Sequence, residues 1–259
     1  MALFVAIALI GLIIGSFVNV VVYRVPRRES VVLPASHCPV CEHPLSVWDN
    51  VPVFSYLLLR GRCRHCGTRI SLKYPLVEIA SSVVFVASYA AYGLSINFAL
   101  NAFFLLTLLM VSVIDIEHKI IPNVIVVPAI AIGAVVLGSL SIVAGGEAAL
   151  IDGGGFAGPA IGFLGGGGFL LLLAWLWPNG MGGGDIKLAA LMGLFLGRYV
   201  VIAIFIGFFL GALGGVLAMS LLGMSRKDQI PFGPYLAAGA VLTLFIGVPL
   251  SSWYLGMLS

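Results

Sequence analysis

The chain has 259 residues, of which 61% are hydrophobic and only 9% are charged, and its mean hydropathy is +1.16. Soluble globular domains carry about 25% charged residues, so this composition excludes an ordinary water-soluble protein and predicts an all-α protein that crosses a lipid bilayer several times. The formal net charge of +3 is small, and the positions of the charges are therefore more informative than their sum.

The first apolar run, residues 2–23, is predicted to be a permanent membrane span. It lacks the basic N-terminal region and the small-residue cleavage site that mark a signal peptide. Seven further apolar runs follow, at 76–92, 97–114, 122–141, 159–177, 185–198, 200–222 and 235–255. We therefore expect about eight transmembrane helices.

The polar segment between the first two spans, residues 24–75, holds eight of the thirteen Lys and Arg residues. Such clusters also occur on nucleic-acid-binding surfaces, but membrane topology explains a short loop between two spans better, so no nucleic acid is expected as a partner. If the loop is cytoplasmic, threading eight spans places twelve of the thirteen basic residues on that side and leaves Arg198 outside. The basic residues that this threading places on the cytoplasmic side outside the loop are Lys119, Lys187, Arg226 and Lys227.

All four cysteines lie in this loop, as two C-x-x-C pairs: Cys38 with Cys41, and Cys63 with Cys66. Two such pairs supply four thiolates for one tetrahedral structural zinc ion. Disulfides are disfavoured in a loop that faces the reducing cytoplasm, and a redox pair would need only one motif within a βαβ unit. A loop of about 50 residues is too small for a core alone to hold it, so zinc binding would stabilise its fold.

Two aspartates lie at the edges of apolar runs. Asp115 follows the run 97–114, and Asp185 opens the run 185–198 within Gly182-Gly183-Gly184-Asp185. A lone aspartate at a helix end is equally explained by solvation, but carboxylates at membrane edges are costly and are functional candidates. The threading places both at the cytoplasmic boundary, where they are able to converge. In such a pair one carboxylate takes a proton from water, and the other, protonated, polarises the scissile carbonyl.

The helix ends suggest different roles for the two aspartates. Asp115 lies at the C-terminal end of its predicted helix, where the dipole disfavours negative charge, and Asp185 lies at an N-terminal end, where the dipole favours it. We therefore predict that Asp185 is the ionised base and that Asp115 holds the proton.

Glycine pairs four residues apart occur within the predicted spans, at Gly162 and Gly166 and at Gly207 and Gly211. Small residues at this spacing allow two membrane helices to approach closely. We interpret these glycines as packing positions rather than ligand-binding ones.

Several short elements carry a resemblance that extends over almost the whole chain. They are Gly15-Ser16-Phe17-Val18-Asn19-Val20, the double C-x-x-C loop, Asn50-Val51-Pro52, Leu59-Arg60-Gly61, Tyr74-Pro75-Leu76-Val77-Glu78, Asp115, Ile121-Pro122-Asn123, the G-x-G-D element ending at Asp185, and Pro231-Phe232-Gly233-Pro234. The G-x-G-D element alone is weak in a chain with 33 glycines, but these elements in this order are specific. In them the chain resembles the bacterial type IV prepilin peptidase family.

The resemblance implies a bifunctional enzyme of the bacterial inner membrane that serves type IV pili and type II secretion. Such an enzyme cleaves the leader of prepilins or pseudopilins at the cytoplasmic face and then methylates the new N-terminal residue with S-adenosylmethionine. Asp115 and Asp185 match the family's catalytic aspartates, and the four cysteines match its zinc ligands. Asn123 departs from many relatives, which have Asp at a position not thought to be catalytic. No methyl-donor-binding unit is recognisable, so the residues that bind this cofactor are unknown.

The expected organisation is a first transmembrane helix at 1–23, a zinc-binding loop domain at 24–75 and a seven-helix aspartic peptidase domain at 76–259. The main alternative is a transporter or proton-relay protein, which would need polar residues across the depth of the bilayer rather than at one face. A non-catalytic zinc-anchored scaffold is a second alternative, but it would leave the two aspartates without a role.

Overall fold

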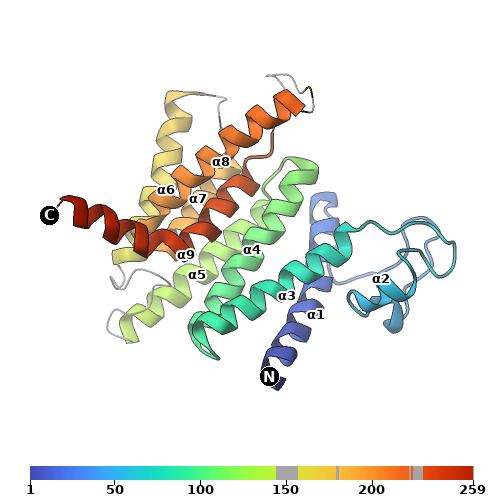
Figure 1. Cartoon of the computed structure of the whole chain (residues 1–259). Helices are drawn as coiled ribbons and strands as arrows, with labels where there is room; N and C mark the ends of the chain where they lie inside the picture. The colour runs from blue at the N-terminus through green and yellow to red at the C-terminus, as the bar shows by residue number, and fades with distance from the viewer. Residues whose placement is uncertain (144–156, 179–180, 222, 224–229, 259) are drawn as a thin grey trace. The chain divides into compact units, whose positions relative to one another are not determined.

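The described part of the protein is mostly helical. The computed structural model describes residues 1–143, 157–178, 181–221, 223 and 230–258, and no β-strand occurs among them. The α-helices are α1 (Ala2–Arg24), α2 (Phe54–Leu58), α3 (Lys73–Tyr92), α4 (Ile96–His118), α5 (Asn123–Val143), α6 (Ala157–Leu176), α7 (Gly183–Leu196), α8 (Val200–Leu221) and α9 (Gly233–Leu258) (Figure 1). The predicted all-α fold is confirmed.

The described residues contain seven helical stretches that are long and apolar enough to cross a membrane. One of these stretches, Gly183–Leu221, holds both α7 and α8, which the 3₁₀ turn η3 (Gly197–Tyr199) separates. Gly197 ends α7 in a left-handed conformation with φ of 59°, which glycine adopts without strain. All eight helices of the predicted multi-pass fold are therefore present in the described chain. Arg226 and Lys227, which the topology prediction used, lie outside the described residues.

The chain divides into two compact units, Met1–Leu106 and Thr107–Ser259, so that α4 contributes to both. The three-part division at residues 23 and 75 stays a prediction.

In the first unit, α1 and α3 lie side by side (Figure 1). Glycines permit this close packing: a Cβ atom on Gly11 would lie 2.6 Å from Cα of Ser82, and one on Gly15 would lie 2.6 Å from Cα of Glu78. The hydroxyl of Ser82 also donates a hydrogen bond to the carbonyl oxygen of Ala8 at 2.9 Å. Close backbone approach with interhelical hydrogen bonds is how helices associate in a bilayer, where apolar side chains gain little from leaving lipid.

The segment between these two helices folds with little regular structure. It contains the turns η1 (Val25–Arg27) and η2 (Val47–Asn50), the short helix α2 and both C-x-x-C turns. A capping box starts η2, where the backbone N–H of Ser46 donates to the carboxylate of Asp49 at 3.3 Å, and the hydroxyl of Ser46 donates to the same carboxylate at 2.8 Å. Arg64 also donates to Asp49 at 2.8 Å, and these hydrogen bonds from Ser46 and Arg64 hold the pKa of Asp49 below its ordinary value. The contact joins the part of the loop that carries the first cysteine pair to the part that carries the second.

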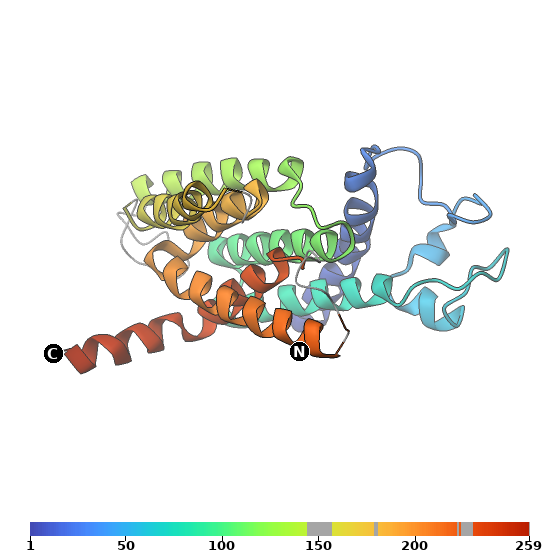
Figure 2. The ribbon, with the colours of Figure 1, turned by 90° about the horizontal axis from the view of Figure 1, so that it is seen from above.

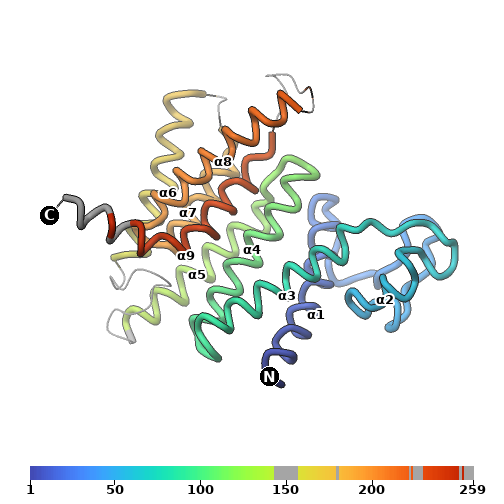
Figure 3. The backbone as a smooth tube through the Cα atoms, in the orientation of Figure 1, coloured from blue at the N-terminus to red at the C-terminus, as the bar shows by residue number. Residues whose placement is uncertain are grey.

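In the second unit, α6 and α7 pack together through glycine (Figure 2). A Cβ atom on Gly162 would lie 2.5 Å from the carbonyl oxygen of Gly197, and one on Gly166 would lie 2.6 Å from that of Ala189. Helices α8 and α9 also run side by side (Figure 3), and they too pack closely at a glycine. There a Cβ atom on Gly207 would lie 3.1 Å from Cα of Leu236. Glycine as a packing residue at these positions is confirmed.

Candidate functional site

Asp115 lies in the last turn of α4 and is buried, with 5% of its surface exposed. The apolar run ends at residue 114, but the helix continues to His118, and the N–H of Lys119 donates to the carbonyl oxygen of Asp115 at 2.8 Å. The aspartate therefore lies one turn inside the helix, where the helix holds its backbone.

The carboxylate of Asp115 accepts a hydrogen bond from the backbone N–H of Gly233, with 2.8 Å between N and Oδ2. Gly233 is the first residue of α9, and the N–H groups in the first turn of a helix have no partner within the helix. The N–H groups of Tyr235 and Leu236 donate to the carbonyl oxygen of Phe232, and Pro234 has no N–H. The N–H of Gly233 is thus the donor that the start of α9 offers to Asp115.

Glycine is required at position 233 because of space rather than conformation. A Cβ atom there would lie 2.9 Å from Oδ2 of Asp115 and 3.4 Å from Cδ1 of Ile121. The first of these distances is shorter than a normal van der Waals contact, so any side chain at position 233 would displace the carboxylate.

Asp185 is the third residue of α7, with Gly182 at the N-cap. Its backbone N–H donates to the carbonyl oxygen of Gly182 at 3.1 Å, and its side chain is partly exposed. A Cβ atom on Gly182 would lie 3.0 Å from Oδ2 of Asp185, so the glycine leaves room for the carboxylate to fold back over the helix start.

Ile121 links the surroundings of the two aspartates. A Cβ atom on Gly184, the residue before Asp185, would lie 2.6 Å from Cβ of Ile121. The same isoleucine side chain lies against Gly233, which binds Asp115. The carboxyl groups of Asp115 and Asp185 are close enough to interact electrostatically. The structure therefore brings the two predicted aspartates together, within one unit of the chain.

Two carboxyl groups that interact in this way share one proton readily, because two like charges in a partly buried site repel each other. Such a pair is able to activate water and polarise a carbonyl at the same time. Asp115 faces the start of α9, and Asp185 lies in the first turn of α7. Since both carboxyl groups are next to a helix N-terminus, the dipole argument no longer distinguishes them. The predicted roles of base and acid stay a prediction.

A further contact steadies the start of α7. Nζ of Lys187 donates to Oδ1 of Asn123 at 2.7 Å, which ties α7 to the first residue of α5. Ile121 and Gly233 lie in short elements that carry the family resemblance, and Asn123 departs from it; the sequence assigned none of the three a role in the site. The Gly-Pro pair at the start of an apolar run was the available signal that a helix N-terminus lies at Gly233.

The four cysteines gather in the first unit. Their Sγ atoms all lie within 4.8 Å of one another, and those of Cys38 and Cys66 are 3.9 Å apart. A zinc ion with Zn–S bonds of about 2.3 Å places its four sulfur atoms about 3.8 Å apart at the corners of a tetrahedron. The cluster therefore fits a tetrahedral metal ion, and none of the four thiols is in a disulfide.

The two C-x-x-C turns have the same backbone geometry. In the first turn, the N–H of Cys38 donates to the carbonyl oxygen of His43, and the N–H of Glu42 donates to the carbonyl oxygen of Cys38. In the second turn, the N–H of Cys63 donates to the carbonyl oxygen of Thr68, and the N–H of Gly67 donates to the carbonyl oxygen of Cys63. Glu42 and Gly67 occupy the same position and have φ of 56° and 71°, in the left-handed region. Each turn thus presents two thiols from one tight loop of backbone.

In each turn, hydrogen bonds favour the thiolate, the form that binds metal, at one of the two cysteines, whereas burial and the neighbouring thiols raise the pKa of Cys41 to about 11. The hydroxyl and the backbone N–H of Thr68 lower the pKa of Cys66 to about 6. The backbone N–H groups of Cys41 and Val40 lower the pKa of Cys38. These two thiols are therefore prepared for metal by their own turns.

Comparisons with known proteins match the two regions of the chain that carry the cysteines and the aspartates. Residues 9–92 match the Bacterial Peptidase A24 N-terminal domain, and residues 102–216 match the Type IV leader peptidase family. A protein of Burkholderia pseudomallei (strain K96243) named prepilin leader peptidase/N-methyltransferase is 37% identical, over 93% of this chain and 84% of its own length. Proteins of the same name from Bacillus subtilis (strain 168) and Pseudomonas aeruginosa are 34% identical and each cover 95% of this chain, with 96% and 91% of their own lengths aligned. No solved structure matches the chain significantly.

Proposed function

This chain belongs to the type IV leader peptidase family, and we propose that it removes the leader peptide of prepilins or pseudopilins and then methylates the new N-terminal amine. The observation that carries the peptidase part is the meeting of Asp115 and Asp185, which come from two helices and interact through their carboxyl groups. The methyltransferase part rests on the relatives, which are named for both activities along nearly the full length of this chain.

In the proposed reaction Asp115 and Asp185 act as an acid and a base on one water molecule. The ionised carboxylate takes a proton from water as the oxygen attacks the carbonyl carbon of the scissile peptide bond. The protonated carboxyl donates a hydrogen bond to the carbonyl oxygen. A proton then passes to the leaving nitrogen as the C–N bond breaks, which leaves a carboxyl group on the leader and a free amine on the pilin.

S-adenosylmethionine, when bound, would supply the methyl group from its sulfonium to the nitrogen lone pair of this amine and leave as a neutral thioether. Because an ammonium has no lone pair, the amine must lose one proton before transfer. The enzyme therefore needs a second site, which holds the donor next to a deprotonated amine.

The cysteine cluster is proposed to bind one structural zinc ion. Four thiols at tetrahedral spacing support zinc over a disulfide or a redox pair, each of which would use only two of them. The ion would join the two C-x-x-C turns and so hold the loop between α1 and α3 in place. It is given no part in peptide hydrolysis.

The protein is proposed to lie in the bacterial inner membrane with the aspartates and the zinc loop toward the cytoplasm. The distribution of Lys and Arg, with twelve of thirteen on one predicted side, supports this orientation. It would meet prepilins destined for type IV pili or type II secretion before their export.

The test is a reaction of the purified full-length protein, in lipid nanodiscs, with a prepilin and S-adenosylmethionine. Mass spectrometry should show a product that has lost its leader, followed by the same product heavier by one methyl group. Without S-adenosylmethionine, only the first product should form. A prepilin that stays intact with the zinc-loaded protein would overturn the peptidase assignment.

A further inference from the structure

The loop between α1 and α3 exposes large apolar side chains. Five of them lie in two neighbouring elements, the turn η2 and the helix α2, and between 55% and 84% of the surface of each is exposed. They form what we call the η2–α2 apolar patch: Val47, Trp48, Phe54, Leu57 and Leu58. Exposed apolar patches on a folded protein mark sites that meet another protein or a membrane, so the patch needs an occupant.

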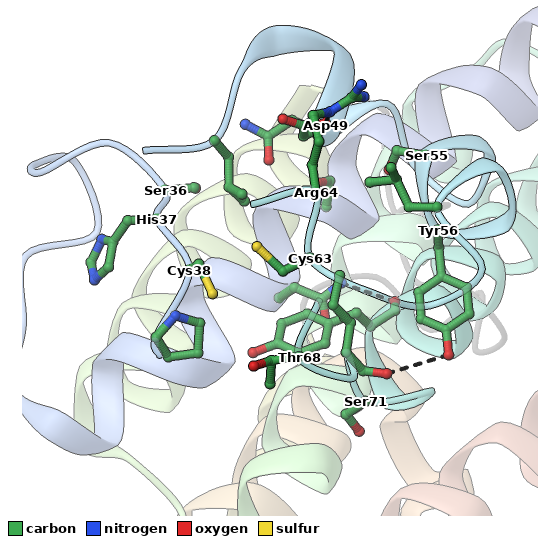
Figure 4. A pocket seen from close by; sticks show the side chains of 18 of the residues that line it. Ser36, His37, Cys38, Asp49, Ser55, Tyr56, Cys63, Arg64, Thr68 and Ser71 are labelled. Atoms are coloured by element: carbon green, nitrogen blue, oxygen red, sulfur yellow. Dashed lines mark hydrogen bonds and ion pairs between the residues drawn. The ribbon is translucent and has the colours of Figure 1, made fainter. Parts of the chain in front are cut away.

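Helix α2 turns its polar side chains inward and its apolar side chains outward. Ser55 and Tyr56 line a cavity of about 410 Å³ between the loop, the end of α1 and the start of α3 (Figure 4). The hydroxyl of Tyr56 donates to the carbonyl oxygen of Ile70 at 3.3 Å, which holds α2 in this orientation. The patch residues of α2 do not line the cavity and are exposed instead. A helix surrounded by water would turn the opposite way, with its apolar side toward the interior.

The patch is anchored beside the membrane-spanning part of α1 rather than beyond its end. The backbone N–H of Val53, just before α2, donates to the carboxylate of Glu78 in α3 at 2.8 Å, and the hydroxyl of Ser16 in α1 donates to the same carboxylate. Ser16 precedes the last residue of α1, Arg24, by about 12 Å of helix. Because α1 is long and apolar enough to cross a bilayer, the turn that carries α2 is docked at the depth of the last turns of a span.

A groove of about 250 Å³ lies between this part of the loop and the exposed side of α1. Ile13 and Phe17 of α1 line the groove, and each is more than half exposed on a helix of membrane-spanning length. Asn50 at the end of η2 and Pro52 before α2 line its other side. The patch therefore lies next to the surface that α1 presents to lipid. Figure 1 shows the loop projecting sideways from α1 and α3.

Two arginines follow the patch directly. Arg60 and Arg62 come after α2, are exposed, and have no ion-pair partner among the described residues. Segments that lie in a membrane interface combine these features: aromatic and aliphatic side chains enter the boundary between headgroups and acyl chains, and basic side chains stay with anionic headgroups. A soluble partner would have to displace lipid to reach a patch at this depth. The geometry therefore favours the bilayer as the occupant.

We propose that the η2–α2 apolar patch inserts into the membrane leaflet in which α1 ends, with Arg60 and Arg62 among its headgroups. The loop is then attached to the bilayer at three places, by α1, by α3 and by the patch between them. It lies on the membrane instead of extending freely into water. The proposal concerns the loop alone and does not depend on the assigned reactions.

The fluorescence of Trp48 tests the depth of the patch. The zinc-loaded full-length protein is placed in nanodiscs whose phospholipids carry bromine on their acyl chains. The emission of Trp48 is the difference between the wild type and Trp48→Phe, a variant that keeps an apolar ring at this position. Bromine should reduce this difference at least about twofold relative to unbrominated lipid, and iodide in the water should reduce it little. Emission that iodide quenches and bromine does not would overturn the proposal.

A photo-crosslink identifies what covers the patch. A diazirine amino acid in place of Leu58, irradiated in native membranes, should yield phospholipid adducts on the peptide that carries it, as mass spectrometry of that peptide would show. The same amino acid in place of Glu42, an exposed charged residue of the same loop, is the matched control and should give few such adducts. Cross-links from position 58 to another protein, to a second copy of this chain or to water alone would contradict insertion. The readout needs no enzymatic activity, so it is separate from the peptidase and methyltransferase assignments.

Discussion

Gly233 donates its backbone N–H to Oδ2 of Asp115 at 2.8 Å, although the two residues are 118 positions apart in the sequence. The start of α9 thereby holds a carboxylate that α4 carries, and a side chain at position 233 would displace it. An active-site carboxyl group that is fixed from a second helix is less free to move during the reaction.

Gly233→Ala should lower the rate of leader cleavage about 10- to 100-fold, because a carboxylate displaced by a fraction of an ångström is misaligned for proton transfer. The measurement is kcat on a prepilin with the purified variant. Gly168→Ala is the control, since a Cβ atom there would meet no described atom within 4 Å. Equal kcat for Gly233→Ala and the wild type would show that the hydrogen bond does not position Asp115.

The glycines of the G-x-G-D element should differ in their tolerance of alanine. A Cβ atom on Gly184 would lie 2.6 Å from Cβ of Ile121, whereas one on Gly183 would meet nothing within 4 Å among the described atoms. Gly184→Ala should therefore reduce cleavage strongly by pushing the start of α7 and Asp185 away from Ile121. Gly183→Ala should keep most of the activity. The idea that Ile121 joins the two aspartate segments fails if both variants cleave prepilin equally well.

The second C-x-x-C turn offers a test of backbone strain without a steric clash. Gly67 has φ of 71° and open space around its Cα, so Gly67→Ala should cost about 1 to 2 kcal/mol through the left-handed conformation alone. Because the loop is expected to fold with its metal, zinc retention against a competing chelator should weaken about 5- to 30-fold.

Glu42→Ala provides the control, since Glu42 has φ of 56° and already carries a Cβ atom. Its zinc retention should change much less than that of Gly67→Ala. If Gly67→Ala retains zinc as the wild type does, the turn geometry does not limit metal binding.

Removal of the metal should loosen the loop and leave the aspartate unit folded. We expect one zinc ion per chain by elemental analysis, and a strong chelator should remove it. Hydrogen exchange should then rise across residues 36–70 and stay unchanged in α7, because the thiols hold the loop and lie in the other compact unit. Added zinc should reverse the change. Slow exchange across the loop after zinc removal would contradict a structural role for the metal.

Much of the fold follows from composition and spacing. Apolar runs, all but the short run 185–198 of about bilayer length, predicted the eight helices, and glycines four apart predicted the packing of Gly162 and Gly207, because both patterns are local in the sequence. The helix break at Gly197 was also visible as an interruption of an apolar run.

The site was predictable only in part. The positive-inside rule placed Asp115 and Asp185 on the same side of the membrane, which permits the electrostatic interaction between their carboxyl groups but does not require it. The hydrogen bond from Gly233 to Asp115 depends on how distant helices dock, and a single sequence does not show that docking. The position of Ile121 against the starts of α7 and α9 depends on helix docking in the same way.

The most direct measurement is the rate of prepilin cleavage by Asp115→Asn and Asp185→Asn, each purified in nanodiscs beside the wild type. Asparagine keeps the size of the side chain but neither gives nor takes a proton, so each variant should lose about 10²- to 10⁴-fold in kcat. Glu117→Gln, two residues along α4 and partly exposed, is the matched control and should cleave at the wild-type rate. Full cleavage by either aspartate variant would contradict a reaction that depends on two carboxyl groups acting together.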